Sequence, residues 1–332
     1  MTQNILYIDN LAIGYKSGKD SRILHKDLCF GIQQGEMNCL LGPNGAGKST
    51  LLRTISGFQP AFNGDIKLKG KSTHDISAAE LSQSIAVVLT DRIDAGNLRV
   101  YDIASMGRHP YTSFWGSLTS KDLRMVGQAL EMTGMISMKN RMFSSLSDGE
   151  KQKVMIAKAL AQDTPIMILD EPTAFLDFPS KIEIMRLLKK LSTDTSKSIL
   201  MSTHDVELAI QSADRIFLLA QEKPFVAGIP EDLVINDHIH NFFEKPGVEF
   251  SKETGAFRIS GPQHTEIGLL GDGLAAQWLG RALNRKGYIV VEGKNQGTFI
   301  QINAINEYIL KMNDQEFHCN CMEDVFHHLL DA

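Results

Sequence analysis

The sequence has no hydrophobic run long enough to cross a membrane, and it carries little net charge. Because a membrane-spanning helix needs roughly 20 consecutive apolar residues, we expect the 332 residues to form a soluble chain of more than one domain. The formal net charge of -5 gives no argument for nucleic-acid binding. The N-terminus has neither a basic region nor an apolar core, so we expect no secretory signal.

Cysteine is also scarce. Two of the four cysteines, Cys29 and Cys39, stand in apolar segments. Since free cysteine behaves as a small apolar side chain, we expect both to be core residues of a protein from a reducing compartment.

A glycine-rich segment follows the apolar residues 37–41 and precedes a helix-compatible run. Its sequence fits a phosphate-binding loop between a buried strand and a helix. Glycines let backbone N–H groups approach phosphate oxygens, and the helix N-terminus adds partial positive charge. We expect Lys48 to reach the β- and γ-phosphates of a nucleoside triphosphate and Ser49 to ligate Mg²⁺. The predicted loop consists of Gly42, Pro43, Asn44, Gly45, Ala46, Gly47, Lys48, Ser49 and Thr50.

Two more buried strands are predicted to end near this loop. Residues 165–169 are followed by Asp170 and Glu171, and residues 198–202 by Thr203 and His204. Ligands bind at the carboxyl edge of such sheets, so Asp170 suits the Mg²⁺ shell and Glu171 suits a base that orients water. His204 is placed to contact the γ-phosphate. Alternation of strands and helices predicts a largely parallel sheet.

The segment at residues 145–152 precedes a run with helical spacing. Ser147 and Glu150 fit a capping box at the start of a helix. A Ser-x-Gly pattern at a helix N-terminus is also a possible anion site, which makes Ser147 and Gly149 candidates for a second phosphate contact. The sequence alone leaves both interpretations open.

Tyr15, at the end of the first predicted strand, is placed either to stack on a base or to pack half-buried. A separator at residues 107–116, rich in aromatic and turn residues, lies between helices predicted at about 101–107 and 121–136. Aromatic residues and arginine are enriched at interfaces, which favours a contact surface there over a loop that packs inward.

Together these residues resemble the ATP-binding-cassette (ABC) ATPase family over residues 3–245. The resemblance implies an α/β P-loop NTPase cassette over residues 1–245, with a mainly parallel sheet and a helical signature subdomain at about 95–160. Residues 42–50 match the Walker A loop, and residues 166–171 resemble Walker B. Residues 146–152 resemble the signature motif, and residues 174–177 resemble the D-loop.

The resemblance also implies ATP and Mg²⁺ as cofactors and assigns roles to single residues. Lys48, Glu171 and His204 match catalytic positions, with His204 as the switch histidine. The implied contacts to ATP outside the loop are Tyr15, as the base-stacking aromatic, Asp170, Ser147, Gly149 and Asp177.

Residues 100–111 resemble the importer ATPases for iron–siderophore complexes, haem and cobalamin. This implies a homodimer that sandwiches ATP on the cytoplasmic face of the inner membrane. Its partners would be integral permease subunits and, indirectly, a substrate-binding protein, with no nucleic acid. The alternative is a soluble cassette ATPase acting on nucleic acid or ribosomes, but those usually carry two cassettes or a long coiled coil. This chain has one Walker A loop and no sustained heptads.

Two positions depart from the family pattern. Where the family usually has glutamine after the strand predicted at 85–89, this chain has Thr90 and Asp91. We hypothesise that this segment still senses the nucleotide: Thr90 contacts Mg²⁺ directly or through a bridging water, or Asp91 takes its place. In the signature, Asp148 replaces glycine. A carboxylate roughly 8 Å from the γ-phosphate would cost about 2 kcal/mol at an effective dielectric constant near 20, which is tolerable.

The C-terminal residues exceed what the cassette needs. Residues 246–261 predict a hairpin and linker, and residues 262–332 a small α/β extension that we interpret as a regulatory or dimer-contact domain. A βαβ unit is predicted from strands at 267–270 and 288–291 and an N-cap at Asp272. The predicted buried helix face consists of Leu274, Trp278, Leu279, Ala282 and Leu283.

Two ligand patterns occur in this extension. Gly271, Gly273 and Ala276, with Glu292, outline a dinucleotide fingerprint, but the 40 residues that follow are too few for a full dinucleotide-binding domain. A soft-metal site is the second pattern. Alternation along 317–321 would put Cys319 and Cys321 on one face and His318 on the other, which favours packing over metal binding. The candidate ligands are His318, Cys319, Cys321, His327 and His328.

Overall fold

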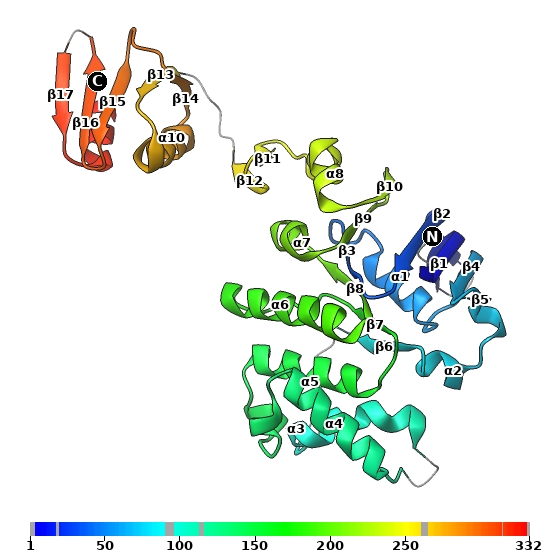
Figure 1. The fold of residues 1–332 in the computed structure, drawn as a ribbon. Coiled ribbons are helices and arrows are strands. Elements are labelled where there is room, and N and C mark those ends of the chain that lie inside the picture. Colours follow the sequence, from blue (N-terminus) through cyan, green and yellow to red (C-terminus); the bar gives the residue numbers. More distant parts are fainter. Residues whose placement is uncertain are drawn as a thin grey trace. The chain divides into compact units, whose positions relative to one another are not determined.

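The computed structural model describes residues 4–17, 20–89, 96–112, 116–259, 265–313 and 315–330. The chain divides into two compact units, Met1–Phe243 and Glu244–Ala332 (Figure 1). Among the described residues, no helix is long and apolar enough to cross a membrane.

Unit 1 is built on a six-stranded sheet in the order β10-β9-β3-β8-β7-β6. Neighbouring strands are parallel except for β9 and β10. Every residue of β3, β7 and β8 is buried, as expected of parallel strands covered on both faces. The predicted fold class is confirmed. The strands are β3 (Met37–Leu41), β6 (Ile85–Val88), β7 (Ile166–Leu169), β8 (Ser198–Thr203), β9 (Arg215–Ala220) and β10 (Lys223–Gly228).

A four-stranded antiparallel sheet, in the order β2-β1-β4-β5, shares its core with the parallel sheet. Ile8 and Leu28 of this sheet belong to one cluster with Leu40, Ile168 and Leu200 of the other. Side chains of helix α1 (Lys48–Ile55) belong to the same cluster, so one core contains residues of both sheets and of this helix. The strands are β1 (Asn4–Ser17), β2 (Asp20–Gln33), β4 (Asn63–Leu68) and β5 (Lys71–Ser72).

The two cysteines of these sheets differ in burial. Cys39 in β3 is buried, and burial raises the pKa of its thiol to about 12. Cys29 is exposed, so the prediction that it lies in the core is wrong. The backbone N–H of Asn10 donates to its Sγ atom at 3.3 Å, on the solvent side of the β1–β2 pair.

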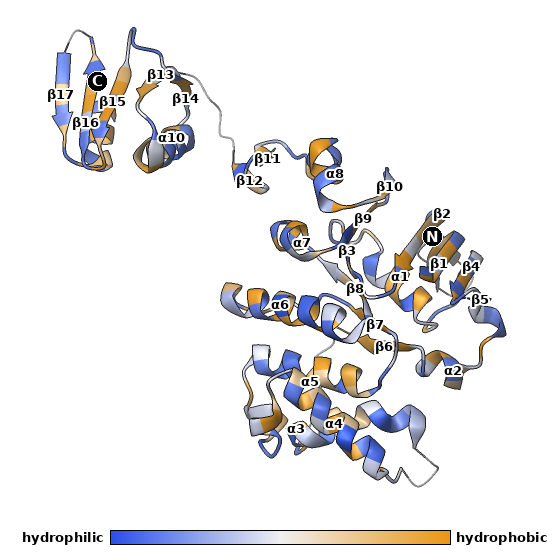
Figure 2. Cartoon of the chain, in the orientation of Figure 1, coloured by the Kyte–Doolittle hydropathy of each residue, from blue (hydrophilic) through white to orange (hydrophobic). Residues whose placement is uncertain are grey.

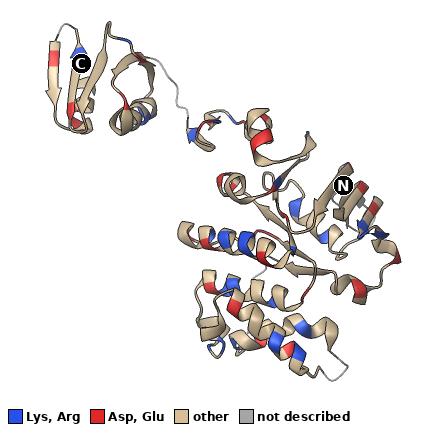
Figure 3. Ribbon diagram, in the orientation of Figure 1, with Lys and Arg blue, Asp and Glu red and all other residues tan. Residues whose placement is uncertain are grey.

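The other regular elements of unit 1 are helices, and hydrophilic and hydrophobic residues alternate along them (Figure 2). Helix α6 carries several lysine and arginine residues (Figure 3). Lys181 pairs with Asp205 at 2.9 Å and Lys189 pairs with Asp214, so α6 is tied to the ends of the sheet. The helices are α2 (Ala78–Ser82), α3 (Val100–Ser105), α4 (Ser120–Met132), α5 (Asp148–Ala161), α6 (Phe178–Thr195), α7 (Val206–Ser212), α8 (Pro230–Ile235) and α9 (His238–Phe243), with 3-10 turns η1 (Thr73–Asp75), η2 (Met106–Tyr111), η3 (Ile136–Met138) and η4 (Phe143–Ser145).

The part of the aromatic-rich separator that contains Arg108 packs inward. Arg108 is 3% exposed, and it donates from Nε to Asp122 Oδ1 and from Nη1 to the Ala161 carbonyl, both at 2.8 Å. Its guanidinium lies 4.0 Å from the centre of the Tyr111 ring. The prediction of a contact surface is therefore wrong at Arg108, because this side chain forms its hydrogen bonds inside the helical subdomain. Phe114 and Trp115 lie outside the described residues.

Unit 2 begins with an antiparallel hairpin of β11 (Val248–Ser251) and β12 (Ala256–Ile259), where the sequence predicts one. Its five-stranded sheet has the order β14-β13-β15-β16-β17. β13 is parallel to both of its neighbours, and α10 joins β13 to β14 as the predicted βαβ unit. The elements are β13 (Thr265–Leu270), α10 (Gly273–Arg285), β14 (Tyr288–Glu292), β15 (Phe299–Ala304), β16 (Glu307–Met312), β17 (Gln315–Cys319) and α11 (Met322–Leu330).

The chain between β14 and β15 passes close over the middle of β13. A Cβ atom on Gly268 would lie only 2.1 Å from the Lys294 carbonyl oxygen. The backbone N–H of Gly268 donates to the Thr298 carbonyl at 2.9 Å. Glycine at this position therefore lets the chain cross from one side of β13 to the other.

Helix α10 buries Ala275, Ala276, Leu279 and Leu283 against the sheet. Leu274 and Trp278 are 65% and 55% exposed, so the prediction that they belong to the buried face is wrong. The stripe that faces the sheet is centred on 275, 279 and 283, and the two larger residues flank it on the solvent side.

The cysteines of unit 2 do not share a face. Strand β17 ends at the buried Cys319, so its alternation does not continue to the exposed Cys321, and the expectation of a common face is wrong. His328 stacks on Phe317 with 4.4 Å between ring centres. In the part of the chain that the structure describes, no group of three His, Cys, Asp or Glu side chains is suited to hold a metal ion.

Asp122 provides a stability test of the helical subdomain. Hydrogen bonds from Thr119 and Arg108 lower the pKa of Asp122 from 3.8 to about 2. Because the folded pKa lies below the unfolded one, its contribution is complete above about pH 4 and is lost as the pH falls towards 2. We expect Asp122→Asn to lower the free energy of unfolding by about 2 kcal/mol at pH 7 and by clearly less at pH 3, as measured by urea denaturation. Arg124→Ala, in an exposed residue of the same helix, is the control, and a deficit that does not change with pH would contradict the assignment.

Candidate functional site

The loop between β3 and α1 needs glycine at several positions. Gly45 and Gly47 have φ angles of 78° and 96°, which residues with a side chain rarely adopt. A Cβ atom on Gly42 would lie 2.1 Å from the Leu219 carbonyl oxygen. The tight turn places the N-terminus of α1 directly after the loop, as the sequence predicts.

Lys48 is held at the mouth of this loop. Its side chain is 5% exposed, and Nζ donates to the carbonyls of Gly42 at 2.8 Å and Pro43 at 3.2 Å. Nζ also lies 3.8 Å from Glu171 Oε1. Burial lowers the pKa of Lys48, and the charges of Glu171 and Asp170 oppose that shift. The amine is thus a positive group held between loop carbonyls and a carboxylate.

Serine hydroxyls hold the carboxylate of Asp170 and the backbone of Glu171, the two residues after β7. Asp170 is 5% exposed, and its Oδ1 accepts hydrogen bonds from Ser49 Oγ at 3.0 Å and Ser202 Oγ at 2.7 Å. Ser202 Oγ in turn accepts from the backbone N–H of Glu171 at 2.8 Å. The hydroxyl and carboxylate oxygens of Ser49 and Asp170 are the type of ligand that Mg²⁺ prefers, so the residues present fit this ion.

Ser202 was not predicted from the sequence. Its position at the end of β8, beside β7, was the available signal, but a serine in a buried strand is usually a packing residue. Glu171 has a φ angle of 48°, an uncommon conformation for glutamate. Ser202 fixes the backbone of Glu171 while it bonds the side chain of Asp170.

The three residues predicted to be catalytic lie together. Glu171 stands between Lys48 and His204, whose Nδ1 atom is 3.7 Å from Glu171 Oε2. The His204 side chain is about half exposed, and that of Glu171 is 25% exposed. Solvent and a ligand therefore have access to both.

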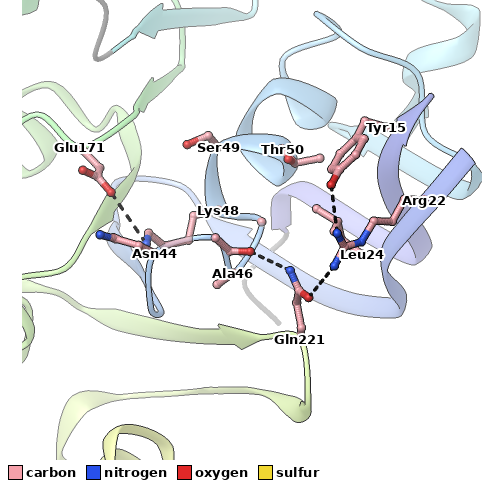
Figure 4. A pocket seen from close by; sticks show the side chains of 12 residues that line it. Tyr15, Arg22, Leu24, Asn44, Ala46, Lys48, Ser49, Thr50, Glu171 and Gln221 are labelled. Carbon is pink, nitrogen blue, oxygen red and sulfur yellow. Dashed lines mark hydrogen bonds and ion pairs between the residues drawn. The ribbon is translucent and has the colours of Figure 1, made fainter. Parts of the chain in front are cut away.

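A pocket of about 690 Å³ opens over the loop (Figure 4). Tyr15, 46% exposed, lies at its wall. Arg22 and Leu24 of β2 and Gln221 of the β9–β10 turn also line it and were not predicted. The signal for Arg22 was its position opposite Tyr15 in a hairpin, which requires the strand register. The full lining is Tyr15, Arg22, Leu24, Asn44, Gly45, Ala46, Gly47, Lys48, Ser49, Thr50, Glu171 and Gln221.

Ser147 begins α5 with the predicted capping box. Its Oγ accepts from the backbone N–H of Glu150 at 3.3 Å, and Glu150 Oε2 accepts from the backbone N–H of Ser147 at 2.8 Å. The backbone N–H and the hydroxyl of Ser147 both donate to the Glu150 carboxylate, and these bonds lower the pKa of Glu150. Asp148 is exposed and lies 3.5 Å from Lys151, so its charge is directed into solvent and partly balanced.

The signature segment lies beside the start of α6. A Cβ atom on Gly149 would be 3.2 Å from Ser180 Oγ, and Asp177 caps α6 by accepting from the Ser180 N–H at 3.1 Å. As far as the described residues show, neither Ser147, Gly149 nor Asp177 lines the pocket over the loop. Thr90 and Asp91 lie outside the described residues.

Both units match known families. A family model described as ABC transporter matches residues 25–174, and one described as iron ABC transporter C-terminal domain matches residues 264–330. The two matched segments fall in different units of the fold.

Several relatives match most of the chain. It is 37% identical over 255 residues to an uncharacterized ABC transporter ATP-binding protein of Methanocaldococcus jannaschii, covering 77% of this chain and 87% of that protein. It is 34% identical over 241 residues to the iron(3+)-hydroxamate import ATP-binding protein FhuC of Bacillus subtilis, covering 73% and 88%. It is also 34% identical over 281 residues to the cobalamin import ATP-binding protein BtuD of Halobacterium salinarum, covering 82% and 70%.

Solved structures give the same picture. The chain matches a transporter described as of metal-chelate type, in an inward-facing conformation, with a TM-score of 0.63 and 27% identity over 72% of this chain and 89% of the other. It matches a dimeric bacterial ABC transporter cassette with a TM-score of 0.58 and 26% identity over 68% and 98%.

The hydroxyl of Ser202 bonds both the carboxylate of Asp170 and the backbone N–H of Glu171, and we expect its loss to lower the stability of the fold. The side chain is fully buried, so Ser202→Ala leaves the backbone N–H of Glu171 without its acceptor and takes one donor from Asp170. We expect the free energy of unfolding in urea to fall by about 2 kcal/mol. Ser117→Ala, in an exposed serine, should change it by less than about 0.5 kcal/mol. Equal stability of the two variants would show that Ser202 is dispensable.

Proposed function

Since the chain belongs to the family of ABC transporter ATP-binding subunits, we propose that it hydrolyses ATP to drive uptake of an iron complex or cobalamin through membrane permease subunits. The observation that carries the proposal is the site itself. Lys48 Nζ lies 3.8 Å from one carboxylate oxygen of Glu171, and His204 Nδ1 lies 3.7 Å from the other. Lys48 and Glu171 both line the pocket. Two of the three relatives named above are import ATP-binding proteins, which does not favour the alternative of a soluble cassette acting on nucleic acid.

We propose that the site is completed by a second copy of the chain. The pocket supplies the phosphate loop, but Ser147 and Gly149 do not line it. In a head-to-tail dimer, those residues of one chain would close over the γ-phosphate bound to the other. ATP would then favour the closed dimer through contacts that the open state lacks. One matched structure is a cassette dimer, which supports this arrangement.

The chemistry we propose is phosphoryl transfer to water, which depends mainly on positioning and electrostatics. Lys48 would neutralise charge on the β- and γ-phosphates. Thr50, at the end of the loop, would hold phosphate oxygens that Lys48 does not contact. Mg²⁺ held by Ser49 and Asp170 would supply further charge neutralisation. Glu171 would orient the attacking water, and His204 would hold the γ-phosphate beside it. Tyr15 would stack on the base.

Several parts of the proposal lie outside the pocket. Docking on a permease would place the chain at the cytoplasmic face of the membrane, with a substrate-binding protein delivering cargo on the other side. Thr90 or Asp91 would report the nucleotide to the permease. Unit 2 would act as a regulatory or dimer-contact domain. These assignments are supported by the resemblance to import subunits and by the family match of residues 264–330.

The cargo can be tested directly. The reconstituted transporter, with its permease and a binding protein, should hydrolyse ATP faster when that binding protein is loaded. We compare a ferric siderophore, haem and cobalamin as loads. The match of unit 2 to an iron transporter domain favours stimulation by an iron complex. If only the cobalamin-loaded binding protein stimulated ATP hydrolysis, cobalamin would replace the iron complex as the proposed cargo. If no loaded binding protein stimulated it, the result would contradict a role in import.

Glu171→Gln tests the proposed base. The amide keeps the shape of the side chain but cannot accept a proton, so we expect ATP hydrolysis to fall by about 100-fold or more. ATP binding should persist, and ATP-bound dimers should accumulate in size-exclusion chromatography. Glu131→Gln, in an exposed glutamate of α4, should hydrolyse ATP at the wild-type rate. Normal turnover by Glu171→Gln would remove Glu171 from this role.

A further inference from the structure

Three polar side chains from different elements form a continuous chain along one wall of the pocket (Figure 4). Tyr15 of β1 and Arg22 of β2 stand opposite each other in the register of the hairpin. Arg22 Nη1 donates to Tyr15 Oη at 3.5 Å, and Nη2 donates to Gln221 Oε1 at 3.4 Å. Gln221 Nε2 donates to the Gly45 carbonyl at 2.8 Å. The chain thus runs from the aromatic ring to the phosphate loop.

Gln221 restrains the loop from outside. The Gly45 carbonyl that it binds belongs to a residue with a φ angle of 78°. The next carbonyl, of Ala46, is also bound by a side chain, with His25 Nε2 at 2.6 Å. Two consecutive carbonyls are therefore directed to the surrounding side chains. These two bonds restrain the backbone of the loop before the ligand arrives.

Arg22 adds a second positive group to the pocket. Lys48 lies at the phosphate loop, whereas Arg22 lies between Tyr15 and Gln221. The oxygens that accept from Arg22, a phenol and an amide, are neutral, so neither cancels its charge. Guanidinium also has five N–H donors, and these two bonds leave donors for a ligand. A positive group between a base-stacking ring and a phosphate loop faces the part of a nucleotide that joins base to phosphates.

We propose that Arg22 and Gln221 are nucleotide-binding residues of this site. Arg22 donates to the ribose and α-phosphate portion that ATP and ADP share, and Gln221 is a positioning residue that holds Gly45 of the loop. The inference rests on the proposed function and extends it to residues outside the loop and the strand ends. It assigns β2 and the β9–β10 turn to substrate recognition.

The test is equilibrium binding of ATP and of ADP to the full chain with Mg²⁺, by isothermal titration. Arg22→Gln keeps an amide donor but removes the charge, so we expect about tenfold weaker binding of both nucleotides. The ratio of the two dissociation constants should stay at its wild-type value, because both ligands carry the α-phosphate. Arg53→Ala, in an exposed arginine of α1 outside the pocket lining, should bind as the wild type does.

Gln221→Ala should weaken the binding of both nucleotides by about threefold. Gln211→Ala is its control. The melting temperature without nucleotide should not change for either Arg22→Gln or Gln221→Ala, since both side chains are solvent-exposed. Wild-type affinity in both variants, or a loss confined to ATP, would overturn the inference. A wild-type chain that binds neither nucleotide would instead overturn the proposed function.

Discussion

The buried carboxylate of Asp170 is the constraint on which the arrangement of the site depends. A charge removed from water costs several kcal/mol unless it is paired or hydrogen-bonded. Ser49 at the start of α1 and Ser202 at the end of β8 meet that need. The same bonds fix the phosphate-loop helix against two neighbouring strands. Glu171 then emerges beside Lys48 because its own N–H is bound to Ser202.

The rest of unit 1 serves this junction. The parallel sheet brings the ends of β3, β7 and β8 to one edge, and the antiparallel sheet adds a side wall through β1 and β2. Inside the helical subdomain, Arg108 and Asp122 are buried together and hydrogen-bonded. It carries the capped start of α5 as a separate surface rather than as part of the pocket. The cassette therefore contains two chemically distinct faces, one around Lys48 and one around Ser147.

Local sequence predicted those features that depend on neighbours along the chain. The loop at 42–50, the strand before Asp170 and the capping box of Ser147 all follow from short patterns with a physical cause. Features that depend on pairing between distant segments were not predictable in the same way. Ser202, Arg22 and Gln221 reach the site only through strand register and a turn.

The errors have the same origin. Burial was predicted wrongly for three residues. Cys29 and Trp278 were expected to be buried and are exposed, and Arg108 was expected at a contact surface and is buried. An apolar or aromatic neighbourhood in the sequence does not show which face of an element is covered. At Arg108 the deciding fact was a buried partner 14 positions away, Asp122. At Trp278 it was the rotation of α10 about its axis, which is set by how the small residues Ala275 and Ala276 pack.

The crossing over Gly268 shows a further effect of such long-range pairing. Because β13 lies between β14 and β15, both of its edges are filled by strands that follow it in the chain and run parallel to it. The βαβ half and the β15–β17 meander therefore share β13, and neither completes the sheet without the other. Such non-local pairing slows folding, so unit 2 should acquire its structure as one cooperative step rather than by adding strands in sequence order.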